Sequence, residues 1–323
     1  MSLLSLLHHQ EAAGRLAPGL LELSGVADSR GYLLTAPTQS IADVIDAKRS
    51  GEISSHGNYV REGTAQELVR NCGADLVIDC MPTNYTDGEP TVSCIRAAAG
   101  AHMHYVTASK GAMALHMAEL LEFSHSRGTH LRFGATVGGG TPFLDFGKEG
   151  LYPQRVSALR GVLNGTTNYV LSSMETGISM ERSLADATEL GYAETDPSND
   201  LKGLDTAAKL VILVNWVIGK RISLDDVDIK GISRVTEADV MAAGKRGRAL
   251  RLIAAYDGSA TVGPVEIERD DVLNVQGALN ALTYETELSG PVTLTGAGAG
   301  GESTAQAILR DILVILRETR SMK

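Results

Sequence analysis

The hydrophobic pattern of the first half of the chain alternates between two kinds of segment. Near-continuous apolar runs, which are typical of strands buried on both faces of a parallel sheet, occur at residues 75–80, 102–107 and 129–135. Segments whose apolar residues recur every three or four positions predict helices at residues 41–51, 64–71 and 113–127. This alternation predicts an α/β domain built on a parallel sheet.

The first residues resemble part of a dinucleotide-binding unit. Residues 2–7 have the apolar spacing of a helix, and residues 19–27 predict a strand that ends at Asp28. A helix followed by a strand that ends in an acid forms the second half of such a βαβ unit. Asp28 could hold an adenosine ribose hydroxyl, whereas Arg30 could meet a 2′-phosphate, so NAD and NADP both stay open. The competing interpretation is an acid that only caps a turn.

The first half of this unit would be a strand followed by a GxGxxG loop, and neither precedes Ser2 in the sequence as given. That loop normally supplies the helix N-terminus that holds the pyrophosphate. We therefore expect the given sequence to start late, by roughly 10–15 residues. Either the sequence is truncated or the start codon lies further upstream.

The hydrophobic pattern changes after Pro142. Residues 157–163 and 249–255 are strand-like, and residues 262–267 alternate between apolar and polar. Helical patterns lie around residues 168–176, 181–190 and 203–218. Together these segments predict an open mixed sheet with helices on one side, and hence a second domain.

Composition narrows the class of protein. The chain has 323 residues, enough for two domains, and a net charge of −10 without a lysine- or arginine-rich run. This charge argues against nucleic acid or an anionic membrane surface as a partner. Cys72, Cys80 and Cys94 lack metal-ligand spacing, which predicts buried free thiols in a reducing cytosol. No apolar stretch approaches the ~20 residues of a membrane span, so we expect a cytoplasmic protein.

Charged residues concentrate in one short stretch of the second domain. Glu194, Asp196, Asp200 and Asp205 precede Lys209 within sixteen residues. That is more charge than a solvated loop needs. It suits a pocket for a small zwitterion whose reaction requires a proton donor.

The same stretch carries the sequences NGTTNY, ELGYAE-x-DP and GLD-x-AAK in this order. At this spacing they resemble the catalytic segment of homoserine dehydrogenase, a far more specific signal than one short motif. The resemblance extends over most of the chain, through VADSRG, DCMPTNYTDGEP, VTASKG, ATVGGGTP and GAGAGGESTA.

The resemblance implies the short form of this family, without an appended regulatory domain. The fold would be a Rossmann-like nucleotide-binding domain, here without its first strand, and an α+β substrate and dimerisation domain with an open mixed sheet. The final helix, residues 303–316, would return to the first domain. The expected boundaries are 1–142 with 301–323 for the nucleotide-binding domain and 143–300 for the substrate domain.

The implied reaction exchanges a hydride between NAD or NADP and the ω-carbon of L-homoserine, giving L-aspartate 4-semialdehyde. This step belongs to the aspartate-derived pathway to threonine, methionine and isoleucine. Lys209 is the expected proton donor, with Lys110 as a second cation, and Asp205 would orient Lys209 and bind the substrate hydroxyl. The competing interpretation is an ordinary surface ion pair on one helical face, worth only ~0.3–0.5 kcal/mol.

The resemblance and the residue types also suggest how the substrate and cofactor are held. Glu194 and Asp200 can bind the substrate ammonium. The amides of Gly165 and Thr166, together with the Thr166 hydroxyl, can bind its carboxylate at a helix start. Thr83 and Lys110 follow predicted strands and so can contact the cofactor, although an exposed lysine is the commoner case. Gly300 would lie against the nicotinamide.

Members of the family hold a monovalent cation through carbonyls of the turn that contains residues 137–140, assisted by a glutamate. In this chain Gly134 occupies the glutamate position. Only Val137, Gly139 and Thr141 remain as weak candidate ligands, and we therefore predict no metal.

Two other functions stay open. One is a dehydrogenase for another amino-acid semialdehyde, because pocket shape cannot be inferred from sequence. The other is a catalytically silent homologue that has lost its cofactor loop and acts as a binding partner. For the enzyme we expect a small-molecule substrate and a homodimer.

Overall fold

The computed structural model describes residues 1–36, 39–193 and 196–321. Contacts divide the chain into two compact units. Unit 1 contains residues 1–133 and the C-terminal segment from residue 308, and unit 2 contains residues 134–307. The last helix, α12 (Gly301–Ser321), begins in unit 2 and continues in unit 1.

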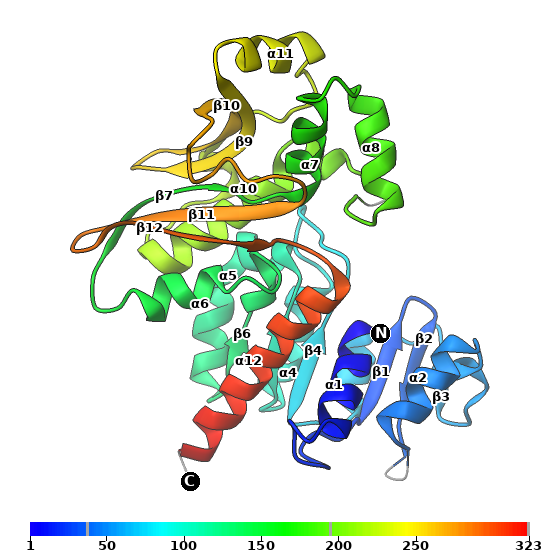
Figure 1. Cartoon of the computed structure of the whole chain (residues 1–323). Coiled ribbons are helices and arrows are strands. Elements are labelled where there is room, and N and C mark those ends of the chain that lie inside the picture. The colour runs from blue at the N-terminus through cyan, green and yellow to red at the C-terminus, as the bar shows by residue number, and fades with distance from the viewer. Residues whose placement is uncertain (37–38, 194–195, 322–323) are drawn as a thin grey trace. The chain divides into compact units, whose positions relative to one another are not determined.

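Unit 1 contains two three-stranded sheets (Figure 1). The first sheet is antiparallel, with β1 (Gly25–Asp28), β2 (Gly31–Leu34) and β3 (Tyr59–Arg61) in sequence order. The second is parallel, with β4 (Leu76–Asp79), β5 (His104–Thr107) and β6 (Leu131–Arg132). The helices are α1 (Ser2–Ala12), α2 (Ile41–Arg49), α3 (Ala65–Asn71), α4 (Thr91–Gly100) and α5 (Lys110–Ser126).

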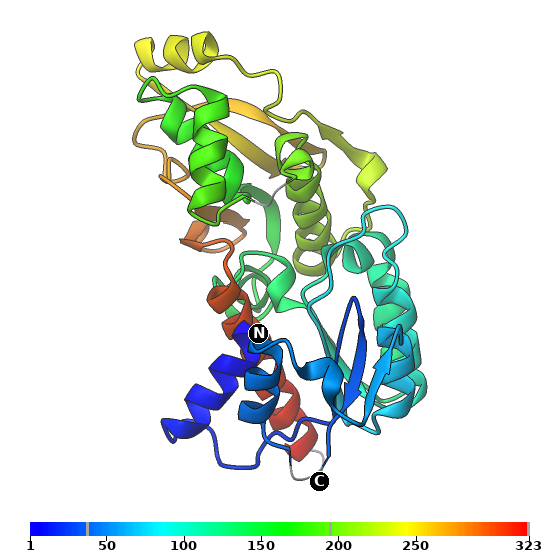
Figure 2. The same cartoon turned by 90° about the vertical axis from the view of Figure 1, so that its right-hand side faces the viewer.

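The parallel sheet confirms the strands predicted from near-continuous apolar runs. Val106 of β5 is fully buried, as a strand covered on both faces requires. Helices α4 and α5 follow β4 and β5 in the chain and pack side by side (Figures 1 and 2). The third predicted strand was wrong beyond Arg132, because the chain turns into a 3-10 helix at Gly134–Thr136.

The strand predicted at residues 19–27 was wrong in its first part. Only residues 25–28 are extended, because Gly19 has a φ of 71° and its amide donates to Glu11 Oε1 at 2.8 Å in a turn after α1. After Asp28 the chain reverses through Ser29 and Arg30 into β2, a hairpin that the apolar pattern did not indicate.

Unit 2 is built on a six-stranded mixed sheet, as predicted. Its strands are β7 (Val156–Val162), β8 (Val227–Ile229), β9 (Arg248–Tyr256), β10 (Ala260–Glu268), β11 (Leu279–Thr286) and β12 (Gly290–Ala297). Their order is β12-β11-β7-β9-β10-β8, and only the pairing of β10 with β8 is parallel. The longer helices are α7 (Gly165–Met174), α8 (Met180–Glu189), α10 (Leu204–Leu213) and α11 (Glu237–Lys245).

Helix α10 forms the centre of the core of unit 2. Its residues 206–208 and 210–213 have no exposed surface, and the helix packs on β9 and β10. A helix that is apolar on nearly all sides must be buried, yet this one carries Asp205 and Lys209 in its first two turns. Charged residues in such surroundings require partners.

No helix in the described part of the chain is long and apolar enough to cross a membrane.

Candidate active site

The start of α7 organises the polar groups of unit 2. Asn164 follows β7 and caps the helix, because its side-chain Oδ1 accepts a hydrogen bond from Thr167 N at 2.8 Å. Gly165 and Thr166 therefore form the first helical positions, where backbone N–H groups lack partners within the helix. The positive end of the helix dipole lies at the same place and favours an anion there.

The amide nitrogen of Asn164 also brings two carboxylates together. Its Nδ2 donates to Asp200 Oδ1 at 2.6 Å and to Asp205 Oδ2 at 2.9 Å. Asn164 is 4% exposed, so both hydrogen bonds form away from bulk water. One buried amide thus links the start of α7 to α10 and to the short helix α9 (Ser198–Leu201).

Lys209 lies against the same carboxylates. Its Nζ is 2.7 Å from Asp205 Oδ2 and donates to the carbonyl oxygen of Leu163 at 2.7 Å. Lys209 and Asp205 are each only 7% exposed. The alternative of an ordinary surface ion pair is therefore wrong. In a buried pair, removing one partner leaves an uncompensated charge, which typically costs about 3–5 kcal/mol.

The electrostatics of Asp200 reflect this crowding. Burial raises the pKa of the Asp200 carboxyl above its ordinary value of 3.8, and the neighbouring Asp205 carboxylate raises that pKa further. Hydrogen bonding from Asn164 and the charge of Lys209 oppose the increase. A carboxylate with a raised pKa beside another carboxylate is well suited to gain a cationic ligand.

Two of the other residues predicted to bind the substrate, Gly165 and Thr166, lie at the start of α7 beside Asn164. The Thr166 hydroxyl donates to the carbonyl oxygen of Tyr192 at 2.7 Å, so it ties α7 to the segment that follows α8. A Cβ on Gly165 would lie 2.8 Å from the carbonyl oxygen of Ala278, which explains the glycine. Glu194 lies outside the described residues.

In unit 1, the acid predicted to bind a ribose hydroxyl lies at the end of β1. Asp28 Oδ1 accepts from Arg30 N at 2.8 Å, and Asp28 Oδ2 is paired with Lys48 of α2. Arg30 is exposed. An acid paired with a lysine and followed by an exposed arginine in the sequence fits a ribose and also fits a ribose that carries a phosphate. The sequence pattern did not indicate Lys48 as a partner of Asp28, because the two lie twenty residues apart.

Two further predicted cofactor contacts meet at the carboxyl ends of the parallel strands. Thr83 follows β4 and its Oγ1 accepts from the backbone N of Lys110, the first residue of α5, at 3.4 Å. Buried Asp79 supports both loops. Its carboxylate accepts from Met81 N at 2.7 Å and from the Thr107 hydroxyl at 2.9 Å. Burial raises the pKa of the Asp79 carboxyl.

The candidate cation ligands form a turn packed against the glycine loop before α12. Thr141 Oγ1 donates to Ala297 O at 3.2 Å, and a Cβ on Gly139 would lie 2.8 Å from Ser303 Oγ. Val137 is fully buried, and Gly300 has a φ of 119°. Within the described ranges, no cluster of three or more His, Cys, Asp or Glu residues could hold a metal. The predicted absence of a metal stays a prediction, because the candidate ligands of that turn were backbone carbonyl oxygens and not these side chains.

Comparison with known proteins places this geometry in a family. Residues 142–313, which contain the whole Asn164–Lys209 cluster, match the family model of homoserine dehydrogenase. A homoserine dehydrogenase of Methanocaldococcus jannaschii is 39% identical over 298 residues, 91% of this chain and 89% of that protein. The chain belongs to the homoserine dehydrogenase family.

Other members agree with this assignment. An NAD(+)-dependent homoserine dehydrogenase of Pseudomonas canavaninivorans is 37% identical over 77% of this chain and 73% of its own length. The crystal structure of a putative homoserine dehydrogenase from Archaeoglobus fulgidus has a TM-score of 0.86 at 33% identity, covering 97% of this chain and 95% of that one. A hyperthermophilic archaeal homoserine dehydrogenase in complex with NADPH has a TM-score of 0.84 at 25% identity, covering 98% and 94%. These likenesses confirm the predicted fold class.

The sequence pattern did not predict Asn164, the central member of the site. Asn164 stood in the NGTTNY motif, but the motif was interpreted only through the glycine and threonine that follow it. An asparagine directly before a helix is a strong capping signal, and that signal could have identified its Oδ1. Its second role, holding Asp200 and Asp205, depends on residues 36 and 41 positions away.

Proposed function

We propose that this protein interconverts L-homoserine and L-aspartate 4-semialdehyde with NAD or NADP, as an oxidoreductase of the aspartate-derived pathway to threonine, methionine and isoleucine. The observation that carries the proposal is the buried Lys209–Asp205 ion pair joined to Asp200 by Asn164. Membership of the family supports the same reaction.

Lys209 is proposed as the proton donor and acceptor for the reacting oxygen. When bound, the nicotinamide supplies or accepts the hydride at the ω-carbon of the substrate. In the reductive direction the aldehyde oxygen becomes an alkoxide, and the Lys209 ammonium stabilises and then protonates it. An ammonium has three N–H donors, and the described residues account for two of them, on Leu163 O and Asp205. The third can meet the substrate oxygen.

Asp205 is proposed to orient Lys209 and to accept from the substrate hydroxyl. Lys110 is proposed as a second cation that contributes to the same step. Both residues act by holding charge in place before the reaction begins, which lowers the reorganisation that the transition state requires.

The two charged ends of homoserine are proposed to bind at different groups of the site. Asp200 would accept the ammonium, because its crowded, partly buried carboxylate gains most from a cation. Glu194, which lies outside the described residues, is proposed to share this role. The backbone amides of Gly165 and Thr166 at the start of α7 would bind the carboxylate. Holding both ends aligns the ω-carbon for hydride transfer.

The cofactor is proposed to bind mainly through unit 1. Asp28 would hold a ribose hydroxyl, Arg30 and Lys48 would meet a 2′-phosphate if NADP is used, and Thr83, Lys110 and Gly300 would contact the remainder. Residues 1–142 with 301–323 are thus proposed as the nucleotide-binding domain and residues 143–300 as the substrate domain. One relative is described as NAD(+)-dependent and another was solved with NADPH, which supports either nucleotide.

A homodimer is proposed as the assembly. The six-stranded sheet of unit 2 and its connecting loops leave large apolar side chains exposed, among them Val265, Val272 and Leu288. A second copy of the chain that covered these side chains would remove their apolar surface from water, which favours association.

Steady-state assays of the purified chain test the proposed reaction. The substrates are L-homoserine with NAD or NADP and, in reverse, the semialdehydes of aspartate, glutamate and succinate with the reduced nucleotides. We expect the highest kcat/KM for the homoserine and aspartate semialdehyde pair. A higher value for another semialdehyde would contradict the substrate assignment. Binding of NADP without turnover of any substrate would favour a silent homologue.

A further inference from the structure

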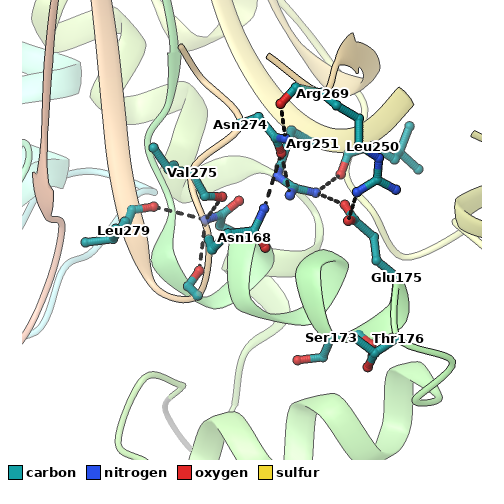
Figure 3. A network of polar contacts seen from close by, with 12 residues as sticks. Asn168, Ser173, Glu175, Thr176, Leu250, Arg251, Arg269, Asn274, Val275 and Leu279 are labelled. Atoms are coloured by element: carbon teal, nitrogen blue, oxygen red, sulfur yellow. Dashed lines mark hydrogen bonds and ion pairs between the residues drawn. The ribbon is translucent and has the colours of Figure 1, made fainter. Parts of the chain in front are cut away.

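The loop between β10 and β11, residues 269–278, packs against α7. Asn168, in the second turn of α7, points toward this loop (Figure 3). Its Nδ2 lies 3.1 Å from Val275 O, 2.8 Å from Gly277 O and 3.1 Å from Leu279 O. Asn168 has no exposed surface, so these contacts form without competition from solvent.

The surroundings of Asn168 determine which way its amide faces. All three neighbours of the nitrogen are backbone carbonyls, which can only accept. The amide nitrogen must therefore face them, and its two hydrogens are shared among three acceptors. A carboxylate in the same place could not donate at all and would be repelled by the carbonyl dipoles.

A second set of contacts holds this loop at Asn274 and at Arg269. Fully buried Arg251 of β9 donates through Nη2 to Asn274 Oδ1 at 2.7 Å and through Nη1 to Leu250 O at 2.8 Å. Its Nη1 also pairs with Glu175, the C-cap of α7, and Glu175 pairs with Arg269 at 3.1 Å (Figure 3). Helix α7 thus holds the loop at two points. Asn168 contacts the loop directly, and Glu175 pairs with Arg251, which in turn holds Asn274.

This loop lies directly against the proposed carboxylate site. The carbonyl oxygen of Ala278 is so near Gly165 that a Cβ there would lie only 2.8 Å from it. Ala278 stands between Gly277 and Leu279, whose carbonyls Asn168 holds. The position of the loop and the position of the first turn of α7 are therefore set together.

We propose that Asn168 is a positioning residue for the substrate carboxylate. By holding residues 275–279, it seats the loop against the first turn of α7 and fixes the directions of the Gly165 and Thr166 amides. This inference rests on the proposed function, because it takes those amides as the carboxylate site. Asn168 itself does not touch the substrate.

A substrate analogue separates positioning from a general structural role. 3-Aminopropan-1-ol is homoserine without its carboxylate and keeps the reacting hydroxyl and the ammonium. A variant that disturbs only the carboxylate site should impair homoserine and leave the analogue unaffected. A variant that loosens the whole fold should impair both by the same factor.

The experiment compares wild-type enzyme with Asn168→Ala and the milder Asn168→Ser, which keeps one donor. For each, kcat/KM and the dissociation constant from NMR titration are measured for L-homoserine and for 3-aminopropan-1-ol. The preference is kcat/KM for homoserine divided by kcat/KM for 3-aminopropan-1-ol. We expect this ratio to fall by about 10- to 100-fold in Asn168→Ala, in line with the cost of a small misplacement, and by less in Asn168→Ser.

Asn215→Ala is the matched control. Asn215 also holds a backbone segment of unit 2, with Nδ2 to Ile222 O at 3.0 Å and Ile222 N to its Oδ1 at 2.9 Å. Its loss should lower stability without changing the preference. If the Asn168 variants do not fold, Asn274→Ala, which releases the same loop from Arg251, should reduce the preference in the same direction.

Two results would overturn the proposal, and they differ. An unchanged preference in the Asn168 variants, or in Asn274→Ala where that variant replaces them, would show that Asn168 has no role in carboxylate binding while the proposed function stands. A wild-type enzyme that binds and oxidises both compounds equally well would mean that no carboxylate site exists, and the proposed substrate contacts would fail as well.

Discussion

At the scale of single residues, the site depends on charged groups that are buried together. Lys209 and Asp205 face each other over 2.7 Å in a helix that is otherwise almost wholly apolar. The desolvation cost of such a pair is high, and stability alone would be served as well by apolar residues. A buried lysine beside two carboxylates is therefore better explained by a task in catalysis than by a contribution to folding.

The pH dependence of substrate capture should follow Asp200. Its pKa is raised by burial and by Asp205, so as pH falls the carboxylate is protonated earlier than an ordinary aspartate. Only the ionised form can hold an ammonium, and kcat/KM for homoserine should therefore decline on the acid side at a pH above the ordinary value of 3.8. In Asp200→Asn we expect a lower kcat/KM throughout and no such decline.

Measured pH profiles of kcat/KM for the wild type and for Asp200→Asn check this expectation. Asp228→Asn is a suitable control, because Asp228 is an exposed aspartate of the same unit whose ion pair in the described part of the chain is with exposed Lys230. An acid limb that persists unchanged in Asp200→Asn would show that another group governs it.

Residue types and motif order predicted most members of the site but not their connections. The acids and the lysine were found because they lie within sixteen residues of one another, in a stretch of recognisable motifs. Asn164 and Lys48 were missed because their partners are distant in sequence and meet them only in the folded chain. Hydrogen bonds between distant residues leave no periodic signal in a sequence.

At the scale of elements, the first turn of α7 carries the amides proposed to bind the substrate carboxylate, and neighbouring elements fix its position. The turn follows β7 in the middle of the sheet, Asn164 caps it, and the loop 269–278 lies against it. Strands β4, β5, β7 and β9 were predicted closely because their apolar runs are strong, whereas the buried strand β11 and helix α11 were not predicted. The β1–β2 hairpin was missed because each strand has only four residues, too few for a clear apolar pattern, and β1 is only partly buried.

Gly165→Ala should disturb this contact between element and loop. The new methyl would lie 2.8 Å from Ala278 O, a backbone atom, so the loop must shift. We expect the KM for homoserine to rise about 10-fold or more while NADP affinity stays unchanged, with a loss of stability of about 1–3 kcal/mol from overpacking.

Gly100→Ala is the matched control for this substitution. Gly100 is also a helical glycine, but a Cβ there would meet nothing within 4 Å. Alanine at such a position should leave activity unchanged and stability unchanged or slightly higher. Equal KM values for Gly165→Ala and the wild type would contradict the proposed carboxylate site.

At the scale of the whole molecule, the chain combines two compact units, to which we assign different tasks as a proposal. Unit 1 presents Asp28, Arg30, Thr83 and Lys110 at strand ends and helix starts, which suits a nucleotide. Unit 2 presents the buried ion pair. The two-unit organisation followed from the change of hydrophobic pattern after Pro142, although contacts place the change near residue 133.

The proposed homodimer can be checked directly. Sedimentation equilibrium of the purified protein at micromolar concentration should give twice the mass of one chain, because exposed apolar side chains of unit 2 would be covered in the interface. A mass of one chain at these concentrations would contradict the dimer and leave the chemistry of the site unaffected.

The most direct test of the central claim is the turnover of Lys209→Ala. With Lys202→Ala as the control, since Lys202 is an exposed lysine near the same site, kcat for homoserine and the dissociation constant for NADP are measured. We predict that kcat falls by about 10²- to 10⁴-fold in Lys209→Ala alone, with NADP affinity nearly unchanged. Turnover that survives in a folded Lys209→Ala enzyme would contradict the account.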